Sequence, residues 1–178
     1  LIREIVLSKT YRQSSLPTPE ALESDPENLW LSHQTRYRLP AEMIRDLALM
    51  SSGLLVDELG GPSARPYQPA GYYAHLNFPT RAYYADKDQQ QYRRGVYIHW
   101  QRQFLHPMLR AFDAPTREEC TAQRPISNTP LAALTLLNDP SFVEAARVLA
   151  QRSLVANDSS VAPSIRWIFQ QVMTRGIK

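Results

Sequence analysis

The sequence has 178 residues, enough for one domain of ordinary size with a buried core. Its 20 basic and 17 acidic side chains nearly cancel, which argues against a dedicated nucleic-acid-binding protein. The single cysteine, Cys120, excludes an internal disulfide framework and a cysteine-rich zinc module. The four histidines lack paired ligand spacing, and no apolar run approaches the ~18 residues of a membrane span. We therefore expect no nucleic-acid partner, no metal site and no membrane span.

The first residues predict a helix with one apolar face. This face carries Leu1, Ile2, Ile5 and Val6. Pro17 is expected to end the helix. Because no initiator methionine precedes it, the sequence is expected to be a fragment of a larger multidomain chain. Thr18 and Asp25 each precede a proline, so both are expected to cap short helices.

A clearer helix is predicted to begin at Pro40 and to end at Gly60-Gly61, where Pro62 follows a left-handed cap. Arg45 and Asp46 lie mostly off the apolar stripe of this helix. The stripe itself consists of Ile44, Leu47, Ala48, Ser51 and Leu55.

Residues 61–88 predict a long ordered loop, because four prolines interrupt regular structure and the segment is too aromatic for a disordered linker. Two interpretations stay open. The aromatic side chains either pack the loop onto the helical core or form a ligand-binding surface. The candidates for binding are Tyr67, Tyr72 and Tyr73, and Phe78, Tyr83 and Tyr84 complete the aromatic set.

Residues 89–106 fit both a strand and a helix. Residues 96–100 alternate as in a strand, but Tyr92, Val96, Trp100 and Phe104 also share a helical face. No segment of similar strand quality occurs elsewhere to pair with this one. A helix is therefore favoured here.

Three further helices complete the prediction. Thr129-Pro130 and Asp139-Pro140 mark two helix starts, and the last helix holds Ile165, Ile168, Phe169 and Val172. In the helix after Pro140, the residues expected to face inward are Phe142, Val143, Ala146, Leu149, Ala150 and Leu154. The predicted fold class is mainly α. We expect one helical domain over residues 1–178, built of short helices with a long ordered loop rich in proline and tyrosine.

Polar side chains concentrate between residues 93 and 139, where the functional candidates lie. An anionic group could be bound by Arg93, Arg94, Arg102, Arg110, Arg117 and Arg124, together with Asn128 and Trp100. The acid–base candidates are Asp113, Glu118 and Glu119, and Cys120 is the candidate nucleophile. Helix and turn capping requires the same polar residue types, so this structural alternative stays open.

Motifs spread over nearly the whole chain resemble a known domain. They include Tyr11-Arg12-Gln13-Ser14, Gly60-Gly61-Pro62-Ser63, Tyr92-Arg93-Arg94, Phe112-Asp113-Ala114-Pro115, Asn128-Thr129-Pro130-Leu131 and Asn138-Asp139-Pro140. On these motifs the sequence resembles the C-terminal domain of unknown function of very large proteins from planctomycetes and related bacteria. Gln123 and Ile126 stand where that family is expected to have basic residues, which weakens the hypothesis of an anion pocket in this loop.

The resemblance implies an exported or periplasmic protein in which a c-type cytochrome-like domain precedes this one. Haem c would then lie in another domain of the parent chain, and no cofactor is expected in this segment. The expected partners are neighbouring domains of the same parent protein, with complex polysaccharide as a further partner.

Three functions stay open from the sequence. The first is an accessory or interaction domain of an exported multidomain protein, linked to polysaccharide handling. The second is a catalytic domain that acts on an anionic polysaccharide. The third is a docking surface for electron transfer with a haem domain, near Trp100. The residues do not decide whether the domain is an enzyme.

Overall fold

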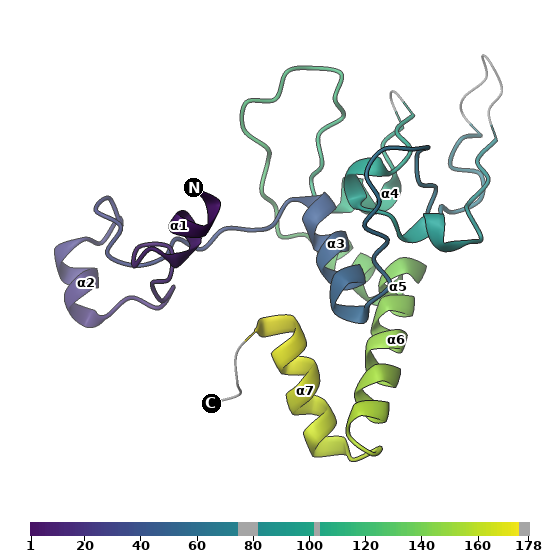
Figure 1. Cartoon of the computed structure of the whole chain (residues 1–178). Coiled ribbons are helices and arrows are strands. Elements are labelled where there is room, and N and C mark those ends of the chain that lie inside the picture. The colour runs from purple at the N-terminus through teal and green to yellow at the C-terminus, as the bar shows by residue number, and fades with distance from the viewer. Residues whose placement is uncertain (75–81, 102–103, 175–178) are drawn as a thin grey trace. The chain divides into compact units, whose positions relative to one another are not determined.

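The computed structural model describes residues 1–74, 82–101 and 104–174 (Figure 1). Phe78 and Arg102, which the sequence singles out, lie outside these residues. The chain divides into two compact units, an N-terminal unit, Leu1–Arg38, and a helical unit, Leu39–Lys178. Each unit is described by itself, and the expectation of one domain over 1–178 stays a prediction.

The prediction of a mainly α protein is confirmed, because regular structure in the described residues consists of helices. These are α1 (Ile2–Leu7), α2 (Pro19–Ser24), α3 (Ala41–Ser52), η1 (Gln89–Tyr92), η2 (Gly95–Tyr97), α4 (Pro107–Ala111), α5 (Pro130–Asn138), α6 (Pro140–Ala156) and α7 (Val161–Met173), where η marks a 3₁₀ helix. The β contacts among the described residues are isolated bridges that join no strands into a sheet.

In the N-terminal unit, one predicted helix is much shorter than expected and one predicted cap is confirmed. Helix α1 ends at Leu7, so the expectation that it continues toward Pro17 is wrong. The Ser8 hydroxyl accepts a hydrogen bond from the Tyr11 amide at 3.2 Å, and such local bonds compete with helix continuation. The Thr18 hydroxyl accepts from the Ala21 amide at 3.2 Å and caps α2 as predicted.

Asp25 does not cap a helix, contrary to expectation. Its buried carboxylate accepts hydrogen bonds from the amides of Leu29 at 2.7 Å and Trp30 at 3.0 Å. Asn28 and Leu31 both have positive φ angles, a conformation that a right-handed helix does not contain. Asp25 therefore holds an irregular turn together.

The helical unit is built around α3, which packs against α4, α6, α7 and η2 (Figure 1). The core beneath α3 consists of Ala41, Ile98, Leu105, Met108, Leu109, Phe112, Ala114, Ala132 and Phe142. Two predicted helix starts are confirmed here. The Thr129 hydroxyl accepts from the Ala132 amide at 3.2 Å, and the Asp139 carboxylate accepts from the Ser141 amide at 2.9 Å.

Helix α3 begins after Pro40 as predicted, but it ends well before Gly60. Gly53 adopts φ 78° directly after Ser52, and its amide donates to the Leu49 and Met50 carbonyls. This left-handed glycine satisfies the last carbonyl groups and stops the helix. The buried face of α3 also differs from the predicted stripe, because Arg45 lies on it and is only 1% exposed.

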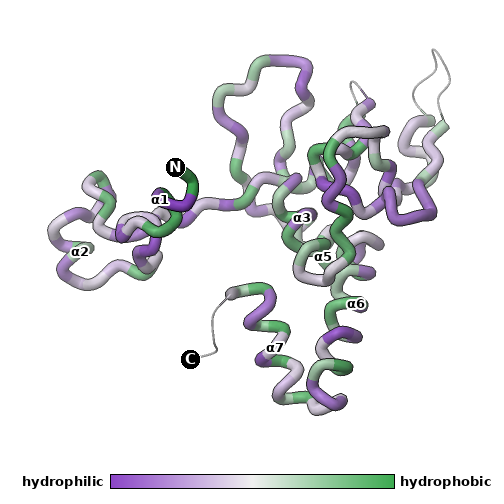
Figure 2. The backbone as a smooth tube through the Cα atoms, viewed as in Figure 1, coloured by the Kyte–Doolittle hydropathy of each residue, from purple (hydrophilic) through white to green (hydrophobic). Residues whose placement is uncertain are grey.

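The inward face predicted for α6 is largely wrong. Phe142 is buried as expected, but Val143 and Leu154 are 48% and 43% exposed. The other buried positions of α6 are Ala145 and Ser153, which are small enough for close helix contacts. The alternation of hydrophobic and hydrophilic residues along α6 and α7 in Figure 2 therefore leaves apolar side chains on the surface.

The helix expected over residues 89–106 is replaced by η1, η2 and an extended segment. The amide of Ala64 donates to the Tyr97 carbonyl at 2.8 Å, and the amide of His99 donates to the Ala64 carbonyl at 2.7 Å. The alternation seen at residues 96–100 is thus satisfied by the loop around Ala64. The loop around Ala64 carries no strand pattern of its own. The sequence therefore contained no sign of a pairing partner and favoured a helix.

Gly95 allows η2 to lie directly on α3. The Asp46 carboxylate accepts a hydrogen bond from the Gly95 amide at 2.6 Å. A Cβ atom at Gly95 would lie 2.8 Å from the Cα and the carbonyl oxygen of Glu42, closer than real Cβ contacts allow. The absence of a side chain at this position is therefore required for the packing of α3.

Substitution Gly95→Ala is expected to lower the free energy of unfolding by about 2 kcal/mol, because backbone atoms of α3 must move to admit a methyl group. Urea denaturation measures the effect. The matched control is Val96→Ala, since Val96 belongs to the same 3₁₀ helix and is 58% exposed. Equal stability of the two variants would contradict the close packing of η2 on α3.

Candidate functional site

Arg93, a predicted ligand-binding residue, is directed into the fold. It is 1% exposed, and its guanidinium donates to the main-chain carbonyls of Gly60, Pro62 and Glu58, the last at 3.2 Å. The same guanidinium lies over the Tyr97 ring, 4.2 Å from its centroid. A rigid fork of donors suits several carbonyl oxygens at once, so Arg93 holds the turn at residues 58–62 in place.

Arg45 forms a second buried arginine centre. It donates to the carbonyl of Arg93 at 2.5 Å and to the carbonyl of Gln91. Burial lowers the pKa of Arg45 to about 10, which still leaves the guanidinium charged at neutral pH. The spacing in the sequence could have predicted the burial of Arg45. It is four residues from both Ala41 and Leu49, so all three share one helix face, and the structure buries both of these apolar residues.

Arg94 behaves differently from its neighbour. Its Nε donates to the Asp57 carboxylate at 2.6 Å, and both side chains are well exposed. The hydrogen bond from Arg94 lowers the pKa of Asp57, while slight desolvation opposes it. Exposed pairs of this kind contribute little to stability.

Two of the predicted anion-binding arginines do converge, and they meet at Glu42 on α3. Arg124 donates to both carboxylate oxygens of Glu42, at 2.8 and 3.3 Å, and Arg117 lies 3.9 Å from one of them. Partial burial acts to raise the pKa of Glu42, but the bond from Arg124, a backbone hydrogen bond and the charges of Arg124 and Arg117 together outweigh it, so the pKa is lowered. The two guanidinium groups thus neutralise an acidic residue of the same chain.

Trp100 completes this cluster. The Arg117 guanidinium lies over the Trp100 ring, 3.8 Å from its centroid, and the Trp100 indole N–H donates to the Thr116 carbonyl at 3.1 Å. Asp113 holds the two ends of the loop 113–128 together, since it accepts from the Ser127 amide at 2.8 Å and hydroxyl at 2.7 Å. Figure 1 shows this loop as a long arch between α4 and α5.

The remaining candidates of the loop lie on its surface. Glu118, Glu119 and Cys120 are exposed, and Asn128 is exposed directly before the Thr129 cap. Asp113 is half-buried and bonded to Ser127. The structure therefore gathers Arg117, Arg124 and Trp100 around Glu42, places Asp113 at the base of the loop and leaves the adjacent Glu118, Glu119 and Cys120 exposed on it.

Most described tyrosines of the predicted loop pack inward. Tyr73 is 7% exposed and makes edge contacts with Tyr83 and Phe104, at centroid distances of 5.7 and 6.0 Å. The Tyr72 hydroxyl donates to the Leu105 carbonyl at 2.8 Å. These contacts support the interpretation that the tyrosines pack the loop onto the core. Tyr67 is the exception among the three binding candidates, with 45% of its surface exposed.

The main chain at Tyr67 is fixed from beneath by His106. The His106 side chain is 2% exposed, and its Nε2 donates to the Tyr67 carbonyl at 2.9 Å. Burial lowers the pKa of His106 to about 4, and the nearby Arg45 charge acts in the same direction, against the bond to Tyr67. The imidazole is therefore neutral at neutral pH.

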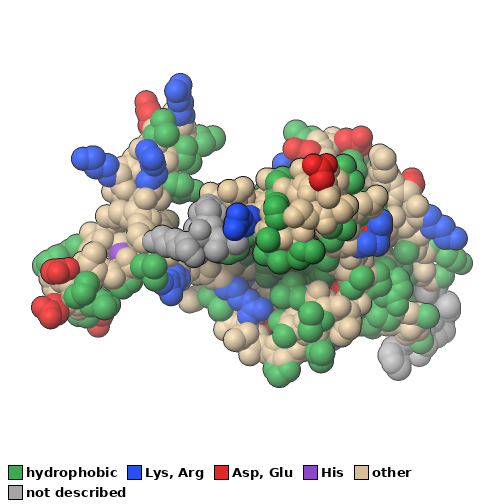
Figure 3. Space-filling view, turned by 90° about the horizontal axis from the view of Figure 1, so that it is seen from below, with side chains coloured by type: hydrophobic (Ala, Val, Ile, Leu, Met, Phe, Trp, Pro, Cys, Tyr) green, Lys and Arg blue, Asp and Glu red, His purple; other side chains and the backbone are tan. Residues whose placement is uncertain are grey.

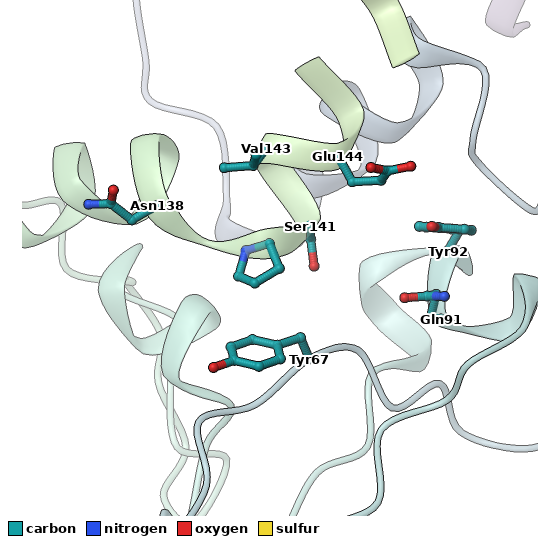
Figure 4. Close-up of a pocket in the computed structure, with 8 residues that line it drawn as sticks. Tyr67, Gln91, Tyr92, Asn138, Ser141, Val143 and Glu144 are labelled. Carbon is teal, nitrogen blue, oxygen red and sulfur yellow. The ribbon is translucent and has the colours of Figure 1, made fainter. Parts of the chain in front are cut away.

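Two hollows adjoin Tyr67. The first has a volume of about 410 Å³ and lies between Tyr67, η1 and the start of α6 (Figure 4). The second is a groove of about 620 Å³ beside α4 and α5, lined in part by Tyr72, Met108, Leu131 and Leu134. Two other predicted binding residues, Tyr72 and Arg110, line this groove with Tyr67. The sequence did not predict that they meet, nor that Gln91 and Ser141 lie beside Tyr67, because these residues come from separate segments.

The described residues carry neither a metal-binding cluster nor a membrane-spanning helix. No group of three histidine, cysteine or acidic side chains in that part of the chain is placed to hold a metal ion. No helix there is long and apolar enough to cross a bilayer.

Substitution Arg93→Lys is expected to lower the free energy of unfolding by about 3 kcal/mol, because one ammonium group cannot replace the fork that serves three carbonyls. The matched control is Arg94→Lys, which should leave the urea midpoint nearly unchanged because the Arg94 pair is exposed. Similar midpoints for both variants would contradict the role assigned to Arg93.

The stability of the wild-type chain is expected to fall between about pH 6.5 and pH 4. The unfolded His106 imidazole takes up a proton near pH 6.5, whereas the folded one does so only near its pKa of about 4, so acid favours the unfolded state by about 3 kcal/mol. Denaturation of wild type and His106→Asn across this range measures the difference. His33→Asn is the control and should keep the wild-type slope; a wild-type slope in His106→Asn would refute the assignment.

The family to which the chain belongs is shown by comparison with family models. The model described as PSD1, a protein of unknown function (DUF1553), matches residues 1–178. No curated protein and no solved structure matches the chain. The chain is therefore a member of the PSD1 (DUF1553) family of proteins of unknown function.

Proposed function

We propose that the chain is a non-catalytic interaction module and that α5 carries its docking face. The observation that carries the proposal is the exposure of all four leucines of this short helix. Leu131, Leu134, Leu136 and Leu137 are 59%, 53%, 47% and 71% exposed. Leucines at this density on a surface helix normally lie against another surface.

The groove beside α5 extends this apolar face. Pro69, Tyr72, Pro107 and Met108 line it opposite Leu131 and Leu134. In the space-filling view of Figure 3, hydrophobic side chains also gather in patches on the helical unit. A partner could pack against the exposed leucines of α5 and insert an apolar side chain into the groove beside them.

The state of the charged candidates favours a docking role over catalysis. Glu42 is bonded to Arg124, and Asp113 is bonded to Ser127 at the base of its loop. A catalytic acid–base pair needs two groups that share a reacting position. The candidate carboxylates Glu118 and Glu119 lie on the exposed part of the loop instead.

The setting of the module is part of the proposal. Its resemblance to domains of large planctomycete proteins supports an exported or periplasmic location and a parent chain with a c-type haem domain. The partner of α5 is then a neighbouring domain of that parent protein, and the assembly acts on complex polysaccharide. Catalysis on an anionic polysaccharide and electron transfer to a haem domain are the alternatives to this role.

The double substitution Leu131→Ser and Leu134→Ser is expected to weaken binding of the adjoining parent segment about 100-fold, because two leucines lose their burial. Isothermal titration of the purified chain with that segment measures the affinity. The control is Val155→Ser on α6, which removes a side chain that is 78% exposed. Unchanged affinity of a correctly folded double variant would refute the docking face.

A further inference from the structure

The cavity of about 410 Å³ beside Tyr67 has a lining unlike that of the groove. Its walls come from the loop at Tyr67, from η1 and from the junction of α5 with α6 (Figure 4). The lining consists of Tyr67, Gln91, Tyr92, Asn138, Pro140, Ser141, Val143 and Glu144. Aromatic rings, amides and hydroxyls therefore surround the space, and its volume lies within the usual range for small-molecule sites, about 300–1,000 Å³.

Tyr67 provides a fixed aromatic surface at one side of the cavity. The residues on either side of it, Pro66 and Gln68, are buried, while its own side chain is 45% exposed. His106 holds the Tyr67 carbonyl at 2.9 Å from the interior. Because the main chain is anchored on the inside, only the side-chain torsions of Tyr67 lose freedom when a ligand binds.

Gln91 provides a fixed polar group opposite the ring. Its Nε2 donates to the Asp88 carbonyl at 3.0 Å, which orients the amide. Figure 4 shows the side-chain oxygen of Gln91 turned toward the cavity and its nitrogen turned away. Arg45 also binds the main-chain carbonyl of Gln91, so both the backbone and the side chain are positioned before a ligand arrives. The Ser141 hydroxyl projects into the same space.

Glu144 is the charged residue of the cavity lining, and it is paired with Arg147. Its carboxylate oxygens accept from Arg147 Nη2 at 2.7 Å and Nε at 2.8 Å, and this bond lowers the pKa of Glu144. The carboxylate is therefore ionised at neutral pH. Arg147 itself does not line the cavity, and the lining contains no lysine, arginine or histidine. Because Arg147 is already paired with Glu144, the cavity offers an anionic ligand no unpaired cation to offset the loss of its hydration.

We propose that this cavity binds a neutral saccharide unit, with a sugar ring stacked on Tyr67 and hydroxyl groups donating to Gln91 and Glu144. A pyranose ring has an apolar C–H face and a rim of neutral hydroxyls, which matches one aromatic wall and several fixed acceptors. Sulfated and uronic sugars are disfavoured because the lining supplies no unpaired cation to bind their charge. The inference depends on this lining and not on the docking face of α5, so either can fail alone.

The direct test is isothermal titration of the chain with maltose, cellobiose and xylobiose, and with digalacturonic acid as the anionic probe. At least one neutral disaccharide is expected to bind with a Kd in the low millimolar range, about 1–5 mM, and digalacturonic acid at least about tenfold more weakly. Absence of binding for all three neutral probes at about 20 mM overturns the proposal, and so does tighter binding of the anionic probe.

Substitutions of the lining residues test whether the sugar binds in this cavity. Tyr67→Ala is expected to weaken the neutral probe about tenfold, whereas Tyr67→Phe, which keeps the ring, changes it less than about threefold. Gln91→Ala should also weaken it. Tyr84→Ala is the matched control, because Tyr84 is a 75% exposed tyrosine outside the lining. Equal affinity of Tyr67→Ala and wild type, with thermal midpoints matched, would place the sugar elsewhere and overturn the proposal.

Glu144→Gln tests the charge argument separately. This change leaves Arg147 without its carboxylate partner, so it is expected to strengthen digalacturonic acid about tenfold. The neutral probe should change by less than about threefold, since the amide keeps an acceptor oxygen. An unchanged preference for the neutral probe would remove Glu144 as the source of selectivity. The double variant at Leu131 and Leu134 should bind sugar as wild type does, which separates this site from the docking face.

Discussion

The helical unit depends on two buried guanidinium groups that bind main-chain carbonyl oxygens. Arg45 on α3 binds the carbonyls of Gln91 and Arg93, and Arg93 in turn binds those of residues 58–62. These bonds tie together segments that form no sheet and no long helix in the described residues, so regular hydrogen bonding cannot hold them. A buried charge is tolerated here because several carbonyl dipoles solvate it.

The same arrangement separates structural arginines from functional surfaces. Arg93 works inside the fold, and Arg117 and Arg124 neutralise Glu42 at the base of the long loop. These three arginines thereby bind groups of the chain itself. The surfaces left for partners are apolar, along α5, or polar and uncharged except for Glu144, beside Tyr67. This is the physical basis on which we propose a docking module with a neutral saccharide site.

Sequence reasoning was accurate where a short segment decides its own structure. Thr18, Thr129 and Asp139 cap helices at the predicted places, because a side-chain oxygen and a following proline act within three residues. The mainly α class followed from the same local signals. Among the candidate site residues, the sequence named Tyr67, Arg117, Arg124 and Trp100 but not the residues they meet, since nothing near them in the chain points to Glu42 or to Gln91.

Tertiary structure alone decided the remaining features. Residues 89–106 lost their predicted helix because Gly95 must lie against α3 and residues 97–99 pair with Ala64. Arg45 is buried because the fold places the carbonyls of Gln91 and Arg93 next to it. The leucines of α5 are exposed because Ala132 is the residue of this helix that contacts the core. The sequence by itself determined helix starts and class, which depend on neighbours along the chain. Burial, register and site geometry depend on neighbours in space, and only the folded chain supplies those.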